Sequence, residues 1–378
     1  MERFDAIVVG AGPAGSTAAF RLSRAGARVL LLDRERFPRD KPCGGGLTYR
    51  AVRQLPPTVT VEPVVEDTVR RCQLGLAYEK RFERRSDEPL ILMTQRRRLD
   101  AYLADQAAAT GAEFRDGVRA TALELEDGGA TVRFDGSSAF APVVLGADGV
   151  NGLTARAVDL HGARHHAVAL EGNVSHAHAR EDYRGRVLVE LGAVPGGYAW
   201  VFPKGDHVNV GVGGWESEGP RLRAHLERAC SEYGLPAERL ESVRGYRLPM
   251  RQAGAGARRG RVLLVGDAAA LVDPLSGDGI YEALVSARLA AESALALLAG
   301  GSLDAYERAL ERELGGSLSA SWQAKLALER FPRLIFGVAR LPLVWGFIGG
   351  LLRGDFAHPH EATGFVRAPL RLVEALGR

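Results

Sequence analysis

A glycine-rich turn between a short apolar strand and a helix constrains this chain more than any other feature of its sequence. The turn, residues 10–15, has the sequence Gly-Ala-Gly-Pro-Ala-Gly and fits the pattern G-x-G-x-x-G. Residues 4–9 before it are predicted to form a buried strand, residues 16–24 a helix and residues 29–32 a second buried strand. This order of strand, helix and strand predicts a parallel sheet.

Each glycine of this turn has a physical reason to be there if the turn holds a dinucleotide. Gly10 allows the tight turn, Gly12 lets a pyrophosphate approach the backbone, and Gly15 lets helix and strand pack closely. The helix N-terminus offers free N–H groups to phosphates, and Asp33 can accept hydrogen bonds from a ribose diol. The predicted dinucleotide-binding residues of this segment are Gly10, Gly12, Pro13, Ala14, Gly15, Asp33 and Arg34.

A second junction of strand and helix lies far downstream. Residues 261–267 are predicted to form a strand ending in Gly-Asp, and residues 274–280 lead into a helix over 279–298. A second junction is superfluous for a pyridine nucleotide, whereas FAD is longer and carries a ribityl chain and a flavin ring. We therefore predict FAD, with Asp267 bonding the ribityl or pyrophosphate region, although Asp267 as a turn-capping carboxylate stays an alternative. The helix N-terminus near Gly279 can stabilise negative charge on reduced flavin. The predicted FAD contacts here are Asp267, Gly277, Gly279 and Ile280.

Two further segments between the junctions are predicted to lie near the cofactor. Residues 145–150 end a strand and are expected to turn beside it. Arg96 precedes a helix predicted over 97–109 and is expected to reach the cofactor's phosphates or ribose. The alternative for Arg96 is a solvated arginine in an Arg-Arg-Arg run.

The predicted fold class is α/β, or α+β overall. A Rossmann-like FAD-binding domain with a parallel sheet is joined by an inserted antiparallel β-sheet substrate domain and a helical C-terminal region, because residues 165–215 change to strands and turns. The predicted boundaries are 1–70, 95–160 and 245–300 for the FAD-binding domain, 71–94 and 161–244 for the substrate domain, and 301–378 for the helical region.

Charge and cysteine content narrow the function classes. The 49 basic and 46 acidic residues give a net charge of +3, too balanced for a nucleic-acid binder. The three cysteines are widely spaced, with no metal-ligand cluster, so we predict neither a disulfide framework nor a metal site. A reducing cytoplasm fits this cysteine usage, and no signal peptide opens the chain.

Residues 334–352 are strongly apolar and approach the length of a membrane span, but Arg340 and Pro342 interrupt them. A transmembrane helix is therefore disfavoured. Two alternatives stay open: a helix pair that covers a lipid cavity or makes peripheral contact with a bilayer, and an ordinary packed helix pair.

Four segments make the chain similar to the geranylgeranyl reductase family, within the larger class of flavoproteins built like aromatic hydroxylases. Two of them are the junctions described above. Residues 41–46, Lys-Pro-Cys-Gly-Gly-Gly, resemble the family's cysteine-glycine loop. The most specific segment is residues 195–203, Pro-Gly-Gly-Tyr-Ala-Trp-Val-Phe-Pro, followed by Gly-Val-Gly at 211–213, which fits P-x-x-Y-x-W-x-F-P and then G-x-G.

This resemblance implies an enzyme that binds FAD and hydrogenates isolated C=C bonds of polyprenyl, geranylgeranyl-type chains. Aromatic hydroxylases usually carry a histidine after Gly-Asp-Ala-Ala, and Ala270 stands there in this chain, which favours a reductase. Two other functions stay open: an FAD-dependent monooxygenase acting on an aromatic or polyketide substrate, and an electron-transfer flavoprotein–quinone oxidoreductase. Because no second G-x-G-x-x-G is present, the expected electron donor is NAD(P)H bound transiently or a small redox protein.

The two remaining segments predict the reaction site. Tyr198, Trp200 and Phe202 follow one another at period two, so on a strand they share one face and form a wall suited to an isoprenoid chain. Sheet core is the alternative reading of this row. Cys43 lies in the glycine loop, where its thiol could donate a proton or hold a substrate carbon, or could be a small buried apolar group. The predicted catalytic residues are Cys43, Tyr198 and Trp200, the substrate-binding residues are Tyr198, Trp200 and Phe202, and the loop's predicted FAD contacts are Cys43, Gly44 and Gly45.

Overall fold

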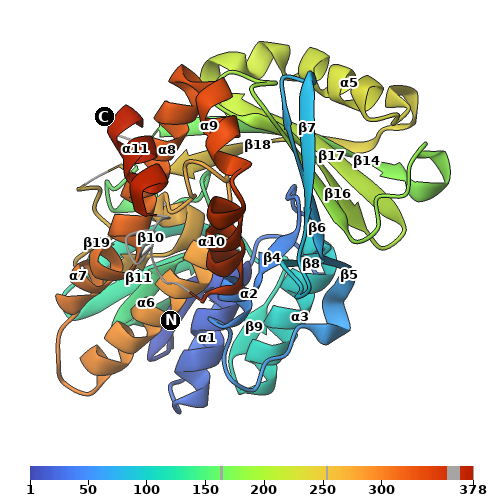
Figure 1. Cartoon of the computed structure of the whole chain (residues 1–378). Helices are drawn as coiled ribbons and strands as arrows, with labels where there is room; N and C mark the ends of the chain where they lie inside the picture. Colours follow the sequence, from blue (N-terminus) through green and yellow to red (C-terminus); the bar gives the residue numbers. More distant parts are fainter. Residues whose placement is uncertain (162–164, 253, 356–366, 378) are drawn as a thin grey trace.

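The computed structural model describes residues 1–161, 165–252, 254–355 and 367–377. It contains the strand-helix-strand unit predicted from the glycine turn, whose helix α1 lies in the lower part of Figure 1. Strands β2 (Ala6–Val9) and β3 (Val29–Leu32) pair in parallel, and helix α1 (Pro13–Arg24) connects them. Every residue of both strands is buried, as expected for a parallel sheet covered on both faces.

This unit belongs to a sheet of six strands within the described residues, in which only an edge strand runs antiparallel. In spatial order the strands are β19 (Arg258–Arg259), β20 (Val262–Leu264), β13 (Val143–Gly146), β2, β3 and β9 (Glu113–Arg115). Helices α3 (Arg96–Ala109) and α6 (Ile280–Leu298) pack against α1. A smaller sheet packs on β2 and β13 and shares their core; it consists of β1 (Glu2–Arg3), β12 (Ser137–Ala141), β11 (Gly129–Phe134) and β10 (Ala120–Glu126).

A second large sheet holds the predicted aromatic row. In the described residues its strands are, in spatial order, β18 (Glu241–Met250), β14 (His165–Ser175), β17 (His207–Trp215), β16 (Tyr198–Lys204), β15 (Arg186–Leu191), β6 (Arg71–Leu76) and β7 (Lys80–Arg85). Neighbouring strands are antiparallel except β15 and β6, which pair in parallel. Helix α5 (Leu222–Glu232) packs on one face of this sheet (Figure 1).

The second sheet extends slightly beyond its predicted limits. Strand β18 continues to Met250, past the predicted boundary at residue 245. Strand β8 (Ile91–Thr94) lies in the segment predicted to belong to the substrate domain, but it is not part of the second sheet. It joins β4 (Gly46–Thr48) and β5 (Val65–Val69) in a three-stranded sheet. The division of the chain into domains stays a prediction.

The region after residue 300 is helical, as predicted. Its helices are α7 (Ala305–Leu310), α8 (Gly316–Arg330), α9 (Pro332–Ala339), α10 (Pro342–Arg353) and α11 (Arg367–Gly377); two short helices elsewhere are α2 (Tyr49–Val52) and α4 (Thr154–Ala157). The Tyr306 hydroxyl donates to the Leu264 carbonyl at 2.6 Å, and the Trp322 indole donates to the Arg251 carbonyl at 2.7 Å. These bonds attach α7 to β20 and α8 to the residue that follows β18.

The apolar run of residues 334–352 is broken where the sequence predicts. Helix α9 ends before Arg340, and α10 begins at Pro342. In the part of the chain that the structure describes, no helix by itself has the length and apolar character needed to cross a membrane; α9 and α10 meet that test only as a pair, which bends by 82°.

Candidate functional site

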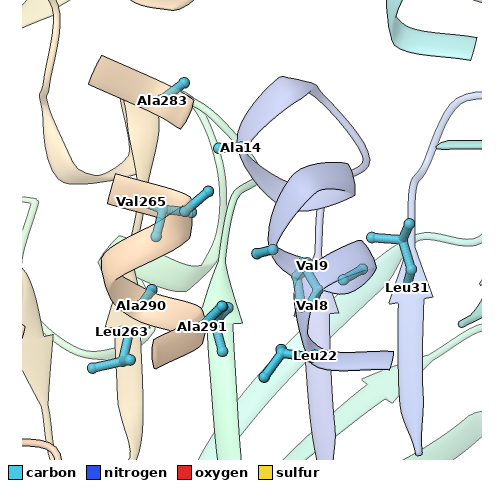
Figure 2. Packing of buried hydrophobic residues seen from close by; sticks show 14 of the residues in the cluster. Val8, Val9, Ala14, Leu22, Leu31, Leu263, Val265, Ala283, Ala290 and Ala291 are labelled. Carbon is cyan, nitrogen blue, oxygen red and sulfur yellow. The ribbon is translucent and has the colours of Figure 1, made fainter. Parts of the chain in front are cut away.

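The two strand-to-helix junctions, far apart in sequence, meet where α1 and α6 begin. Figure 2 shows the two helices side by side, with Ala14 on the first turn of α1 and Ala283 on the first turn of α6. A methyl group placed at Gly266 would lie 3.3 Å from the Ala14 side chain and 3.4 Å from that of Ala283. The Gly-Asp of the second junction therefore lies against the glycine turn, as one shared cofactor requires.

The glycines of the turn differ in what surrounds them. A Cβ atom at Gly15 would lie 1.7 Å from the Gly10 carbonyl oxygen, and one at Gly10 would lie 2.3 Å from the Ala147 carbonyl oxygen. These two glycines are therefore required for packing, and residues 145–150 do turn against them. A Cβ atom at Gly12 would meet only the guanidinium groups of Arg39, at 3.7 Å, and Arg96, at 3.9 Å. Gly12 thus faces an open place beside two cations.

Arg96 is buried and held by a buried partner, not solvated in an arginine run. Its guanidinium makes two hydrogen bonds of 2.7 Å to Asp100, and Arg39 bonds the same carboxylate at 2.8 Å. Burial by itself lowers the pKa of Arg96, but Asp100 outweighs burial and raises that pKa. Burial likewise raises the pKa of Asp100, and the nearby guanidinium groups more than reverse this. Both groups are therefore charged near neutral pH, and Arg39 is a cation of the site that the sequence analysis missed.

Asp33 is placed at the turn as predicted, and Arg34 is not. The Asp33 carboxylate accepts the Ala11 N–H at 2.8 Å and the Glu35 N–H at 2.9 Å, which fixes the end of β3 against the glycine turn. Arg34 is exposed and pairs with Glu35 at 3.2 Å. The structure does not bring Arg34 to the turn, and Arg39, 3.7 Å from Asp33, lies there instead.

Asp267 is not used as a turn cap. Its carboxylate accepts hydrogen bonds from Lys41, at 3.0 Å, and from the Tyr246 hydroxyl. Burial raises the pKa of Asp267, but Lys41 and Tyr246 outweigh burial and hold that pKa below its usual value. A methyl group at Gly279 would lie 3.4 Å from the Asp267 carboxylate, so α6 begins beside it. Lys41 and Tyr246 carry these contacts without having been predicted to do so.

The residues around Gly12 fit FAD. The first turn of α1 leaves backbone N–H groups without intrahelical partners, and Gly12, its N-cap, has no side chain to shield them. The two guanidinium groups beside Gly12 and the Lys41 ammonium group supply positive charge for a pyrophosphate. When bound, FAD supplies the redox chemistry, and the protein supplies binding and orientation.

The aromatic row lies on the face of the second sheet that looks away from α5. Ala199 and Val201 belong to the buried cluster under α5, so the alternate residues of β16 point to the other face. Ring centroids are 5.9 Å apart for Tyr198 and Trp200, and 6.4 Å apart for Trp200 and Phe202. Phe202 also packs against a small core cluster beside the three-stranded sheet. The three rings thus form one continuous row, part of which is sheet core.

The cysteine loop lies directly against this row. A Cβ atom at Gly44 would lie 2.8 Å from the Phe202 ring and 3.8 Å from the Trp200 indole nitrogen, so only glycine permits the approach. Gly45 has a φ of +76°, and its N–H points at the Cys43 sulfur at 3.3 Å. Cys43 itself is half-buried. The structure therefore brings together the loop and the aromatic strand that the sequence analysis assigned to one site.

The aromatic row also touches the second junction. The Tyr198 hydroxyl donates to the Ser276 carbonyl, and a methyl group at Gly277 would lie 3.5 Å from that hydroxyl. At the start of α6 the Ile280 N–H donates to Asp278 at 2.9 Å, so this amide already has a partner. Any charge stabilisation by the N-terminus of α6 must therefore come from other amides or from the helix as a whole.

Glu282, in the first turn of α6, gives a pH-dependent prediction. It is 1% exposed. Burial and the carboxylates of Asp278 and Asp273 raise its pKa well above the usual value, while Arg50 opposes them. A carboxyl whose pKa is higher in the folded than in the unfolded chain loses stability as pH rises above the unfolded value. We expect Glu282→Gln, which resembles the protonated acid, to be more stable than the wild type at pH 8 by about 1–3 kcal/mol.

Denaturant unfolding of the FAD-free protein between pH 5 and 8 measures this difference. The difference in stability between variant and wild type should shrink toward pH 5, because the Glu282 carboxyl of the unfolded wild-type chain is protonated more often there. Parallel stability curves over this range would show that Glu282 is ionised in the folded protein.

Comparison with known proteins agrees with this site. A model of the FAD binding domain family matches residues 3–311. Geranylgeranyl diphosphate reductase of Rhodobacter capsulatus is 33% identical, over 79% of this chain and 77% of its own. Menaquinone reductase of Mycolicibacterium smegmatis is 32% identical, over 97% of this chain and 95% of its own. A geranylgeranyl bacteriochlorophyll reductase-like protein of Thermoplasma acidophilum has the same fold, with a TM-score of 0.78, 23% identity and coverage of 99% and 96%.

The two junctions that meet around Gly12 and the family match together define an FAD-dependent flavoprotein oxidoreductase. Within that class, the chain belongs to the geranylgeranyl reductase family. The predicted α/β fold with a second sheet and a helical C-terminal region is confirmed.

Proposed function

We propose that this protein is an FAD-dependent reductase that hydrogenates isolated C=C bonds of a polyprenyl chain. The observation that carries the proposal is the aromatic row of β16 lying against the Cys43 loop, with the second junction at its Tyr198 end. A row of rings suits a substrate that is apolar along its whole length, because burying that length is favourable at about 25 cal/mol per Å².

The names of two relatives support the polyprenyl chain as the part of the substrate that is recognised. Geranylgeranyl diphosphate and menaquinone, which appear in the names of two relatives, differ in their head groups. Both molecules carry a polyprenyl chain, and that chain is what they share. We therefore propose the polyprenyl chain as the part of the substrate that the aromatic row binds.

The chemistry requires a hydride on one alkene carbon and a proton on the other. FAD held in its reduced form by the residues named below would supply the hydride. We assign the Cys43 loop, Tyr198 and Trp200 to the reacting end of the site, where the half-buried Cys43 thiol is the candidate proton donor and the rings exclude water. The FAD contacts proposed on the protein side are the α1 turn with Arg39 and Arg96, Asp267 with Lys41, and the start of α6. The electron donor is either NAD(P)H or a small redox protein.

Anaerobic turnover of a panel of prenyl lipids with a chemical reductant, followed by mass spectrometry, tests the proposal. A gain of about two mass units per reduced bond, with the head group unchanged, is the expected result. The name menaquinone reductase favours one competitor, a flavoprotein that reduces the quinone ring itself. Ring reduction without chain saturation, or an oxygenated product with oxygen uptake, would replace the proposal by the quinone oxidoreductase or the monooxygenase.

We also propose that α9 and α10 make peripheral contact with a membrane, from which a prenyl lipid would enter. Large apolar side chains lie on the surface here: Leu334 on α9 is 45% exposed, Leu341, just before α10, is 46% exposed, and Leu343 on α10 is 59% exposed. We expect Leu341→Glu to weaken co-sedimentation with anionic lipid vesicles about threefold. Leu125→Glu is the matched control, because Leu125 is 45% exposed on β10, in the smaller sheet. Equal losses in both variants would contradict a specific contact.

A further inference from the structure

Charged side chains from the second sheet form hydrogen bonds with both backbone groups of Cys43, its N–H and its carbonyl. The Cys43 N–H donates to the Glu171 carboxylate at 2.7 Å, and the Lys204 ammonium group donates to the Cys43 carbonyl at 2.7 Å. Hydrogen bonds with an ionised partner are about twice as strong as neutral ones. Two such bonds on a single loop residue, from strands β14 and β16, form a clamp.

The two charged groups of this clamp are costly to bury. Lys204 is 5% exposed, and burial lowers its pKa while Glu171 opposes that shift. Burial also raises the pKa of the Glu171 carboxyl, against the attraction of Lys204. A buried ammonium group is expensive unless its hydrogen bonds compensate for lost water. The bond to the Cys43 carbonyl is one such compensation, so the position of the loop and the burial of Lys204 depend on one another.

The two clamp residues lie on the same face of the second sheet as the aromatic row. Lys204 continues the period-two series of β16 that contains Trp200, so both point to the same face of the sheet. The Trp200 indole donates to Asn209 at 2.8 Å, and Asn209 donates to Asn173 at 2.9 Å. Asn173 and Glu171 are two residues apart on β14 and therefore share that face as well. The second sheet thus holds both the aromatic row and the Cys43 loop in place.

We infer that Glu171 and Lys204 are positioning residues for Cys43, which by holding its N–H and its carbonyl fix the thiol relative to the aromatic row. This inference deepens the proposed function and rests on Cys43 lying at the reacting end of the site. Neither residue touches the reacting atoms in this assignment. Their effect is on where the Cys43 side chain points and on how readily the loop opens.

The test is the rate at which iodoacetamide alkylates Cys43 in the FAD-loaded full-length protein, read for each cysteine by peptide mass spectrometry. The substitutions are Lys204→Met, which removes a positive charge and the donor to the Cys43 carbonyl, and Glu171→Leu, which removes a negative charge and the acceptor of the Cys43 N–H. Loss of the clamp opens the loop in either case, so we expect both variants to accelerate alkylation at least about threefold. A purely electrostatic influence on the thiol would change the two rates in opposite directions, and that result would overturn the inference.

Two further variants complete the design. Lys204→Arg keeps a cation able to donate to the carbonyl and should return the rate toward that of the wild type. Lys325→Met is the matched control: Lys325 is also buried, at 6% exposure, and donates to the Gly196 carbonyl, but it does not contact the Cys43 loop. Its substitution should leave the alkylation rate unchanged. If Lys204→Met does not fold, Glu171→Leu still decides the outcome, because an unchanged alkylation rate in that variant would contradict the clamp.

Turnover adds a second readout. In both clamp variants kcat for prenyl-lipid reduction should fall while KM changes little, because the substrate wall remains in place. Alkylation needs no turnover, so the two claims fail separately. A wild-type protein that reduces no prenyl lipid contradicts the proposed function, whereas unchanged alkylation in the variants contradicts the positioning role.

Discussion

Gly12→Ala is expected to give a folded protein that has lost most of its affinity for FAD. Gly12 has a φ of −73° and a ψ of −175°, which alanine adopts without strain. The nearest atoms to the added methyl group are guanidinium nitrogens at 3.7 and 3.9 Å, so nothing in the protein is displaced. The methyl group would instead occupy the place where a pyrophosphate approaches the backbone. We expect the Kd for FAD to rise about 100-fold, equivalent to about 3 kcal/mol.

Titration of the FAD-free protein with FAD, followed by flavin fluorescence, measures this change, and denaturant unfolding without FAD shows whether the fold is intact. Gly219→Ala is the control, because a methyl group there meets nothing within 4 Å and φ is not positive. Gly15→Ala is unsuitable, since its Cβ atom would lie 1.7 Å from a carbonyl oxygen and would disrupt the turn itself. Wild-type affinity in Gly12→Ala would mean that the phosphates do not lie at this turn.

Arg96→Met is expected to destabilise the FAD-free protein by about 3 kcal/mol, because it leaves the Asp100 carboxylate buried with only Arg39 as a charged partner. Asp100 has 0% exposure, so water cannot replace the lost guanidinium group. Unfolding by denaturant in the absence of FAD measures this loss without any contribution from cofactor binding.

The double variant Arg96→Met, Asp100→Leu separates the two roles of Arg96. It should recover part of the lost stability, because no buried carboxylate is then left without Arg96, and Arg39 keeps Asp33 at 3.7 Å as its charged partner. Its affinity for FAD should stay low if Arg96 also faces the phosphates beside Gly12. Unchanged stability in the single variant would contradict the buried pair, and normal FAD affinity in the double variant would leave Arg96 a purely structural residue.

The features that sequence predicts well here are local ones. The glycine turn requires residues a few positions apart, and each required glycine is explained by a close backbone approach within the unit or to residues 145–150. The aromatic row follows from period two on a single strand. The same period extends to Lys204, so the charge on the aromatic face could have been predicted from the sequence.

The features that sequence misses are pairings across long distances in the chain. Glu171 meets Cys43 across 128 residues, and Lys41 meets Asp267 across 226. No periodic pattern relates such partners, since only the packing of the two sheets and the loop brings them together. The prediction named Arg34 where the structure has Arg39, for a similar reason. The loop after β3 has no regular period, so spacing from Asp33 does not indicate which arginine turns inward.

The most direct test of the central claim is a single turnover. The protein with its FAD reduced is mixed without oxygen with a geranylgeranyl lipid, while flavin absorbance and lipid mass are followed together. We predict that the flavin reoxidises and that the lipid gains about two mass units for each flavin oxidised, with its head group unchanged. Flavin that stays reduced in the presence of the lipid, or that reoxidises while the lipid mass does not change, would contradict it.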